Sequence, residues 1–431
     1  MQLTIRAFIL ALLGFIPLVL VPRPGVVLVW AFIWLVCVLI DWLLTPKPKA
    51  LTLTRNITPH TVRLGEPAVN ELVVYNPTQR RMRVDVRDVW APTTNLDREV
   101  GTLTIPPGER RRWRATAHPV RRGWRHNQAT ALRCYGPLGL ASRTHTGTIP
   151  GRLLVLPPFR ARRHLPSRLA RLREMDGASS VNVRGQGTEF DSLREYVIGD
   201  DVRAIDWRAT ARLRDVLVRT WRPERDRRVV IVLDTGRLAA VRLGVETRLD
   251  TSIEAALLLA ALASHAGDRV DVMACDTTTQ AQVSSQSSST LMHQLAINLA
   301  HIEPMLEETD WTYVASQVRR IVRQRSLVVF ITALDPAVIS GNLTGAVKAL
   351  ARTHTVVVAG AHDAEITALT QQRSTSKEAA IAAAAEAHLA DIHAGCAALM
   401  RAGAHVVSGL ADELPPRLAD MYLQLKQAGK L

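Results

Sequence analysis

Residues 229–266 read VVIVLDTGRLAAVRLGVETRLDTSIEAALLLAALASHA, and this stretch decides the fold. It begins with a continuous run of branched apolar residues that ends in Asp234, which is typical of a strand buried on both faces of a sheet. Residues 251–266 follow as an apolar stretch of helical length. A buried strand followed by a helix predicts the first unit of an α/β domain.

The same alternation continues to the C-terminus. Residues 269–275 and 281–285 flank a short turn and predict a hairpin. Further strands are expected at 327–332, 354–360 and 404–409, and helices at about 289–303, 311–324, 341–351, 376–402 and 411–427. Strands that alternate with helices predict a parallel sheet covered on both faces. With one antiparallel strand at its edge, this pattern resembles the von Willebrand A fold, so residues 228–431 are predicted to form a doubly wound α/β domain of that type.

Residues 49–158 predict a different architecture. Short alternating or apolar runs are separated by the turn-forming stretches LGEP, NPTQ, PPGE and YGPLG. Their spacing predicts an all-β sandwich of about seven to eight strands, without the Cys–Trp–Cys arrangement of immunoglobulin domains.

Residues 1–48 predict a transmembrane helical hairpin, with apolar segments at 7–21 and 26–44 joined by the turn PRPG. The second segment would be roughly 28 Å long as a helix, close to the thickness of the bilayer core. A cleaved signal peptide over residues 1–25 is the alternative, but no small-residue cleavage site follows and a second apolar segment comes at once. Asp41 is expected at the headgroup level.

The charges around these segments predict the topology. Lys47, Lys49 and Arg55 follow the second segment, whereas the intervening loop carries only Arg23. Because basic residues favour the cytoplasmic side, both termini are expected in the cytoplasm, with two helices in a bacterial cytoplasmic (inner) membrane.

The chain is strongly basic, with a net charge of +15. Basic residues are spread and often adjoin acids, and no helix-turn-helix, zinc-finger or RNP pattern accompanies them. We therefore expect no nucleic acid partner, and the lipid of the inner membrane as the attracted surface. A basic protein that binds a membrane surface or nucleic acid is the alternative, and steep salt dependence of its binding would mark it. The four scattered cysteines are typical of reduced thiols.

Residues 177–226 read GASSVNVRGQGTEFDSLREYVIGDDVRAIDWRATARLRDVLVRTWRPERD. Closely spaced glycines permit a tight bend, and the two acids after Gly199 can cap a helix that begins near Val202. The order of RGQGTEF, LREY, GDD and IDW resembles the core signature of the DUF58 family. PVRRGW at 119–124 and YGPLGL at 135–140 resemble the upstream region of that family, in which an acidic residue typically precedes PLGL; here that position is Gly136.

Residues 159–227 are assigned as the segment that carries this signature and links the two domains. Its candidate interaction or structural residues are Arg184, Gly185, Gly187, Glu189, Arg194, Asp200, Asp201, Arg203, Asp206, Trp207 and Arg208. One interpretation is a salt-bridge network that locks one domain on the other, with Trp207 packed between them. The other is a partner-binding face that uses Trp207 and Arg208 as anchors. The resemblance implies a membrane-anchored scaffold that works with a MoxR-type AAA+ ATPase in cell-envelope or stress-related protein assembly; the oligomeric state is left open.

A divalent metal site would be expected in a von Willebrand A domain, and its ligands are mostly missing. Asp234 matches the leading aspartate, and Thr309 matches a later threonine. Gly236 and Leu238 occupy the two serine positions, and Ala333 stands where a second aspartate is expected. Oxygen ligands are what magnesium and calcium require, so we predict no bound metal and a role for Asp234 as a helix cap or loop anchor.

No pattern of catalytic residues emerges from the chain. RGQGTE lacks the lysine of a phosphate-binding loop, and GxSxG and HExxH are absent from the sequence. We therefore predict no enzyme activity and no cofactor, with a hydrolase as the less favoured alternative.

Overall fold

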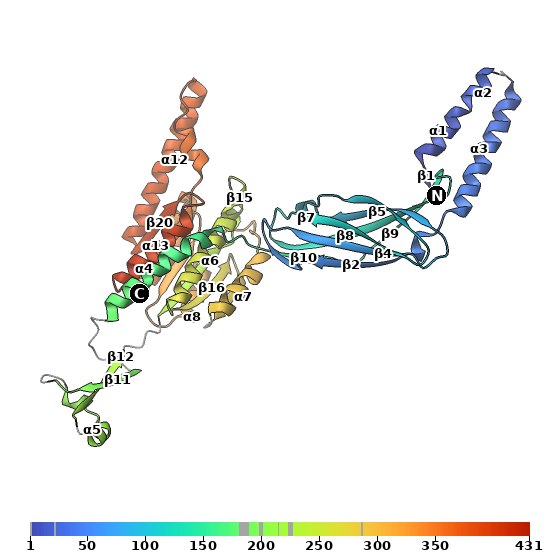
Figure 1. The fold of residues 1–431 in the computed structure, drawn as a ribbon. Helices are drawn as coiled ribbons and strands as arrows, with labels where there is room; N and C mark the ends of the chain where they lie inside the picture. The colour runs from blue at the N-terminus through green and yellow to red at the C-terminus, as the bar shows by residue number, and fades with distance from the viewer. Residues whose placement is uncertain are drawn as a thin grey trace. The chain divides into compact units, whose positions relative to one another are not determined.

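The computed structural model describes residues 2–20, 23–180, 189–197, 201–213, 215–222, 227–285 and 288–431. The chain divides into two compact units, Met1–Pro158 and Phe159–Leu431. Figure 1 shows the elements of each unit.

The first unit begins with the apolar segments. Its first elements are β1 (Gln2–Leu3), α1 (Ile5–Leu13), α2 (Phe15–Leu20) and α3 (Pro24–Leu44). Within the described residues one stretch, Gly25–Ala50, which contains most of α3, is long and apolar enough to cross a membrane, with a mean hydropathy of 2.6. The earlier apolar helix, Ile5–Pro17, is shorter than a span requires. The prediction of two spans is therefore supported for the second segment only.

A β-sandwich follows in the same unit, as the turn spacing predicts. Its strands are β2 (Thr52–Thr58), β3 (Thr61–Arg63), β4 (Ala68–Tyr75), β5 (Met82–Trp90), β6 (Val100–Ile105), β7 (Arg110–Ala117), β8 (Gly123–Tyr135), β9 (Ala141–Gly147) and β10 (Arg152–Leu156). One sheet has the order β2-β4-β7, and the other contains the remaining strands together with β1. Side chains of β5 alternate between buried and more exposed, so Val84 and Val86 face Leu72 and Leu132 in the core.

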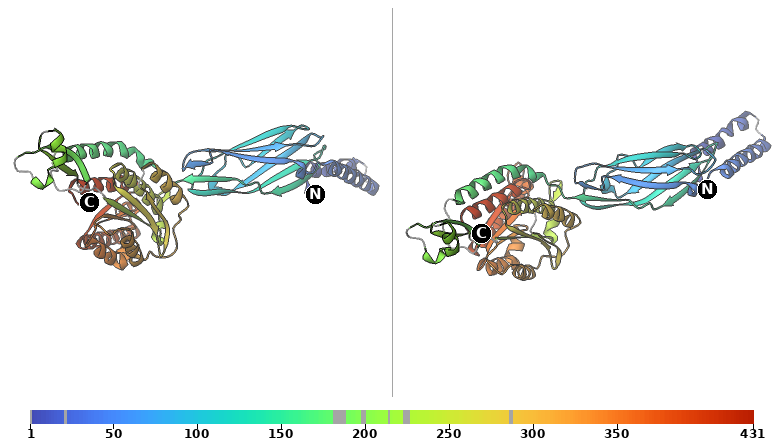
Figure 2. Two further views of the ribbon diagram at one scale, coloured as in Figure 1. Left: turned by 90° about the horizontal axis from the view of Figure 1, so that it is seen from below. Right: turned by 60° about the horizontal axis from the view of Figure 1, so that its bottom comes forward.

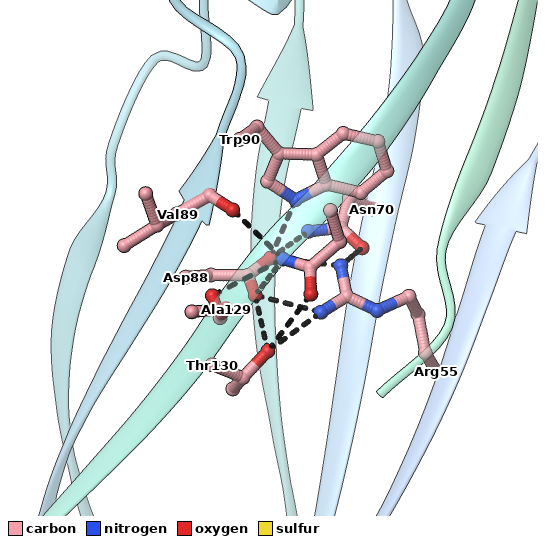
Figure 3. A network of polar contacts seen from close by, with 8 residues as sticks. Arg55, Asn70, Asp88, Val89, Trp90, Ala129 and Thr130 are labelled. Atoms are coloured by element: carbon pink, nitrogen blue, oxygen red, sulfur yellow. Dashed lines mark hydrogen bonds and ion pairs between the residues drawn. The ribbon is translucent and has the colours of Figure 1, made fainter. Parts of the chain in front are cut away.

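The interior of the sandwich also holds a charged network, which Figure 3 shows. The buried carboxylate of Asp88 accepts hydrogen bonds from Arg55 at 2.7 and 2.9 Å, from Asn70 at 2.7 Å, and from Trp90 and Thr130 at 2.8 Å. Burial by itself raises the pKa of this carboxyl group, but the hydrogen bonds and the charge of Arg55 outweigh burial and lower the pKa below its usual value. The network ties β2, β4, β5 and β8 together.

The second unit is built on a six-stranded sheet with the order β17-β16-β13-β18-β19-β20. All neighbours are parallel except β16 and β17, which form the predicted hairpin at the edge. The strands are β13 (Arg228–Asp234), β16 (Arg269–Cys275), β17 (Thr279–Ser285), β18 (Leu327–Ile331), β19 (Thr355–Ala361) and β20 (Ala404–Gly409). The strands expected from the alternation are thus present.

Helices lie on both faces of this sheet (Figure 2). Val229, Ile231 and Leu233 of β13 join one hydrophobic cluster, whereas Val230 and Val232 join another, because successive side chains of a strand point to opposite faces. Helices α4 (Leu165–Ser180), α6 (Arg248–His265), α7 (Ser288–Ala300) and α13 (Leu414–Gln427) contribute to the first cluster, and α8 (Trp311–Ile321), α10 (Thr344–Ala351) and α12 (Ser376–Arg401) to the second.

Short elements complete the two units. They are η1 (Pro48–Ala50), η2 (Pro92–Thr94), η3 (Arg160–His164), η5 (Arg237–Ala240), β14 (Arg242–Leu243), β15 (Glu246–Thr247), α9 (Pro336–Val338), the π-helical turn η6 (Ile339–Leu343) and α11 (Ala364–Leu369).

The start of the predicted linking segment belongs to the second unit. Leu172 of α4 is buried in the same cluster as α6 and α13. The Ala161 N–H donates to Glu254 at 2.7 Å, and Arg168 pairs with Asp420 at 2.7 Å. The description of residues 159–227 as a linker is therefore wrong for this part, because α4 has an apolar face that packs on the α/β unit.

Candidate functional site

The first candidate site lies at the carboxyl ends of the parallel strands, around Asp234. One oxygen of Asp234 accepts the Gly236 N–H at 2.8 Å and the hydroxyl of Thr309, and the other accepts the hydroxyl of Thr332 at 2.5 Å. A Cβ added at Gly236 would lie 2.5 Å from the Thr309 hydroxyl, so no serine fits there without displacement. Asp234 is thus a buried anchor that joins β13, the loop before α8 and the end of β18.

A small cavity of about 170 Å³ opens beside this anchor and is lined by Gly236, Thr309, Trp311 and Asn342 among others. Arg248, the first residue of α6, donates to the Leu238 carbonyl at 2.9 Å. Burial lowers the pKa of Arg248, whereas the carboxylates of Asp335, Asp234 and Asp363 act to raise it. A half-buried guanidinium therefore supplies positive charge at this edge of the sheet.

The donor set around Asp234 does not fit a divalent metal. It contains one carboxylate, both of whose oxygens already accept hydrogen bonds, and two hydroxyls that donate to it. Ala333 is buried and has no side-chain oxygen. In the described part of the chain no group of three or more His, Cys, Asp or Glu side chains is arranged to hold an ion. Magnesium and calcium need several converging oxygens, so we derive no chemistry from a metal here.

We expect isothermal titration of the full chain in detergent to show no magnesium or calcium site of millimolar affinity or tighter. The physical reason is that Asp234 would have to give up its hydroxyl donors before it could bind an ion. The matched control is Asp363→Ala, which removes a carboxylate at the same edge. A stoichiometric isotherm that Asp234→Ala abolishes and Asp363→Ala preserves would contradict this prediction.

The second candidate site is the signature hairpin, defined as residues 189–222 within the described ranges. It contains β11 (Glu189–Glu195) and β12 (Leu217–Arg222), paired antiparallel, and between them η4 (Val202–Ala204) and α5 (Trp207–Leu213). Asp206 caps α5 by accepting the N–H groups of Arg208 and Ala209 at 3.0 Å, and it pairs with Arg219 of β12 at 2.9 Å. These backbone and arginine hydrogen bonds lower the pKa of Asp206.

Two details of the sequence interpretation are corrected here. Asp201 accepts the Arg203 N–H at 2.9 Å, but it caps only the short turn η4. The helix expected near Val202 begins instead at Trp207, with Asp206 as its cap. Trp207 is 68% exposed, which differs from the packed position that the interdomain-lock interpretation gives it. A seven-residue helix has too few turns for its sequence to reveal which face is buried.

The other predicted residues are distributed as follows. Arg184, Gly185, Gly187 and Asp200 lie outside the described residues. Glu189 and Arg194 are in β11, where Arg194 donates to the Glu195 carbonyl at 3.1 Å, and Arg203 and Arg208 are exposed. Arg219, the partner of Asp206, is not among the residues predicted from the sequence. Neither is Thr332, because the expected oxygen ligand of the fourth strand is one residue later, at Ala333.

A third feature joins α3 to the sandwich, and we call it the anchor seat: Asp41 together with the turn Gly136–Ala141. Asp41 is buried, and its carboxylate accepts the N–H groups of Leu138, Leu140 and Ala141, each at 2.7 Å. A Cβ at position 136 would lie 2.4 Å from Asp41 Oδ1, which explains the glycine there. Asp41 thus binds protein backbone at the end of α3, and its expected place at the headgroup level remains a prediction.

These observations define a class of protein: an apolar helix seated on a β-sandwich, followed by an α/β unit that displays a signature hairpin. The comparisons agree for the last part. Residues 192–402 match the model of the family described as "Protein of unknown function DUF58". The part of the chain that carries the signature hairpin and most of the α/β unit is thus similar to this family.

Curated relatives include uncharacterized proteins of Mycobacterium tuberculosis and Mycobacterium bovis. Each is 25% identical over 152 residues, which cover 35% of this chain and 48% of the relative. The chain thus spans about half the length of the curated relatives it matches.

Similar solved structures include the conserved hypothetical protein BatB from Bacteroides thetaiotaomicron, at 16% identity, with 47% of this chain and 99% of that chain covered and a TM-score of 0.31. The SpRpn10 VWA domain matches at 14% identity, with 46% and 94% covered and a TM-score of 0.27.

Proposed function

We propose that this protein is a membrane-anchored, von Willebrand A-like adaptor that presents its signature hairpin to a MoxR-type AAA+ ATPase on the cytoplasmic side of a bacterial inner membrane. In this role it has no catalytic site of its own, and it holds the ATPase near clients in cell-envelope or stress-related assembly. The proposal rests chiefly on the exposure of Trp207 on a well-capped helix.

The hairpin has the properties of a recognition element. Trp207, Val202 and Val197 are 68%, 61% and 61% exposed, although each is a large apolar side chain. Within the described residues, the polar contacts of Asp206 and the cap of η4 hold the hairpin together without using Trp207. Exposed tryptophan at a fixed position is a common anchor of protein interfaces. This favours the partner-binding interpretation over an interdomain lock built on a packed Trp207.

The membrane part of the proposal is supported by α3. Its apolar side chains, including Leu28, Phe32 and Leu43, are exposed in the described structure. Exposing the apolar side chains of this helix to water would be unfavourable in free energy, whereas the hydrocarbon core of a bilayer would solvate them.

Trp207→Ala should weaken binding of the ATPase by roughly 30-fold or more, the effect typical of an interface anchor. It should leave thermal stability nearly unchanged, because the side chain is exposed. The measurement is surface plasmon resonance between the full chain in nanodiscs and a purified MoxR-type ATPase from the same organism. Trp124→Ala is the matched control, since Trp124 is an exposed tryptophan of the first unit. Equal affinities for wild type and Trp207→Ala would count against the proposed docking site.

The proposed topology has a separate test. A phosphatase that is active only after export, fused to the C-terminus, should stay inactive, because both ends of the chain are proposed to be cytoplasmic. A fusion at the same point to a reporter that works only in the cytoplasm should be active. The reverse pair of results would overturn this topology without bearing on the ATPase.

A further inference from the structure

A cavity of about 860 Å³ lies in the first unit, beside the anchor seat. Five arginines line it, and they come from three separate parts of the chain: Arg6 of α1, Arg80, Arg81 and Arg83 at the start of β5, and Arg133 of β8. Tyr135 forms part of the wall. The carbons of the Arg83 and Arg133 guanidinium groups lie 5.7 and 5.3 Å from the centre of its ring.

The five arginines that line this cavity outnumber the two carboxylates next to its wall, those of Asp85 and Asp41. Among the described residues no Asp or Glu carboxylate lies within 4.0 Å of any of these five guanidinium groups. The two carboxylates next to the wall point their oxygens at other donors. Asp85 accepts hydrogen bonds from Tyr135 at 2.5 Å and from Thr102 at 2.7 Å, and Asp41 is satisfied by the backbone of the anchor seat.

The cavity also lies where a membrane surface would be. Ile5 is the first residue of α1 and Leu44 the last residue of α3, and both line it. These are the ends of the apolar helices, so lipid headgroups would stand at the level of the arginines if α3 spans the bilayer. Apolar side chains next to guanidinium groups suit a ligand with a charged head and an apolar tail.

We infer that this cavity binds the phosphate of an anionic phospholipid headgroup. Guanidinium groups present paired N–H donors that match phosphate oxygens, and several of them around one phosphate also offset its charge. The inference rests on the membrane anchoring of the proposed function, but it is independent of the ATPase. A free phosphate compound offers the same chemistry without the apolar tail.

The test uses the full chain in detergent and counts retained lipid by native mass spectrometry. The probes are phosphatidylglycerol and, with the same acyl chains, phosphatidylcholine; inorganic phosphate serves as the soluble competitor. The wild type should retain phosphatidylglycerol in preference to phosphatidylcholine. The triple variant Arg80→Gln, Arg81→Gln and Arg83→Gln should lower that retention by about fivefold for each arginine, or roughly a hundredfold together.

The control variant is Arg87→Gln, Arg98→Gln and Arg152→Gln, which removes three exposed arginines of the same unit that do not line the cavity. It should retain the lipid like the wild type. Equal losses in both triple variants would overturn the inference, because they would indicate attraction by net charge alone. Displacement by millimolar inorganic phosphate with no preference between the two lipids would overturn it in favour of a soluble phosphate ligand.

Membrane insertion is checked separately by carbonate extraction. If the cavity variant stays in membranes yet loses phosphatidylglycerol, the inference holds whatever the ATPase experiment shows. If carbonate extracts the wild type from membranes, the proposed membrane anchoring is wrong. If the wild type retains phosphatidylglycerol and phosphatidylcholine equally, the assignment of the cavity as a phospholipid site is wrong, whatever the extraction shows.

Discussion

Replacing Arg55 with methionine should destabilise the β-sandwich by about 3–5 kcal/mol, since Asp88 would then be a buried charge without its partner. The guanidinium lies 2.7 Å from Asp88, and both side chains are almost fully buried. Hydrogen exchange followed by mass spectrometry on the full chain measures this effect in sandwich peptides, and peptides of the α/β unit serve as the internal reference.

Arg112→Met is the matched control, because Arg112 is an exposed arginine of β7 whose nearest carboxylate oxygen, on Glu71, is 3.7 Å away. Exposed pairs of this kind contribute less than about 1 kcal/mol. Similar losses in the two variants would contradict the assignment of Asp88 and Arg55 as the central polar contact of the sandwich.

The same pair predicts a pH dependence. The pKa of Asp88 is lowered in the folded protein, so its stabilising contribution is complete above the unfolded pKa of about 4 and is lost as the pH falls through the folded pKa. In Arg55→Met burial raises the pKa of Asp88, and the carboxyl group becomes protonated at a higher pH. The stability difference between wild type and variant should therefore be largest near neutral pH and shrink on acidification. A difference that grows below pH ~4 would refute this account.

Asp41→Ala should open the anchor seat. Three backbone N–H groups lose their acceptor, and an unsatisfied buried group costs about 1–3 kcal/mol. We expect the amides of Leu138, Leu140 and Ala141 to exchange with solvent at least ~100-fold faster. Asp97→Ala is the control, because Asp97 also accepts a backbone N–H, that of Thr116 at 2.8 Å, but at an exposed position. Unchanged protection of the three amides would show that Asp41 does not hold the turn.

A second variant makes this test sharper. The upstream region of the family typically has an acidic residue where this chain has Gly136, and Asp41 fills that space from the helix. Gly136→Asp alone should disturb the seat, because its Cβ would lie 2.4 Å from Asp41 Oδ1. In the Asp41→Ala background the new carboxylate can accept the N–H two residues on, as aspartate does in turns, and protection should partly return. If the double variant loses as much amide protection as the two single variants combined, the carboxylate at position 136 does not replace that of Asp41.

The sequence predicts well those features that a local pattern encodes. The run from Val229 to Asp234 is apolar throughout because β13 is buried on both faces, and the hairpin of β16 and β17 follows from two apolar runs around a short turn. β9 escaped prediction because ASRTHTG is mostly polar and lies partly exposed. Pairing with β8 places it in the sheet, and pairing is not visible in the composition of a strand.

The candidate sites depend more strongly on distant contacts. Asp41 reaches amides about one hundred residues away along the chain, as the separations of 97, 99 and 100 show. Thr332 and Thr309 meet Asp234 only through the order of the strands. The exposure of Trp207 depends on which face of α5 finds a neighbour. The residue types of Asp41, Asp234 and Trp207 mark them as candidates in the sequence, but their contacts and exposure follow only from the fold.

The anchor seat has a mechanical consequence. Tyr135, at one end of β8, adjoins the seat, while Gly123, at the other end, pairs with Val155 near the exit to the second unit. The thirteen residues of β8 span about 40 Å as an extended strand. With Asp41 clamped to the turn, the sandwich cannot swivel freely on the segment after α3. Under the proposed membrane anchoring, a pull exerted near Pro158 would therefore reach α3 through β8 and the hydrogen bonds of Asp41.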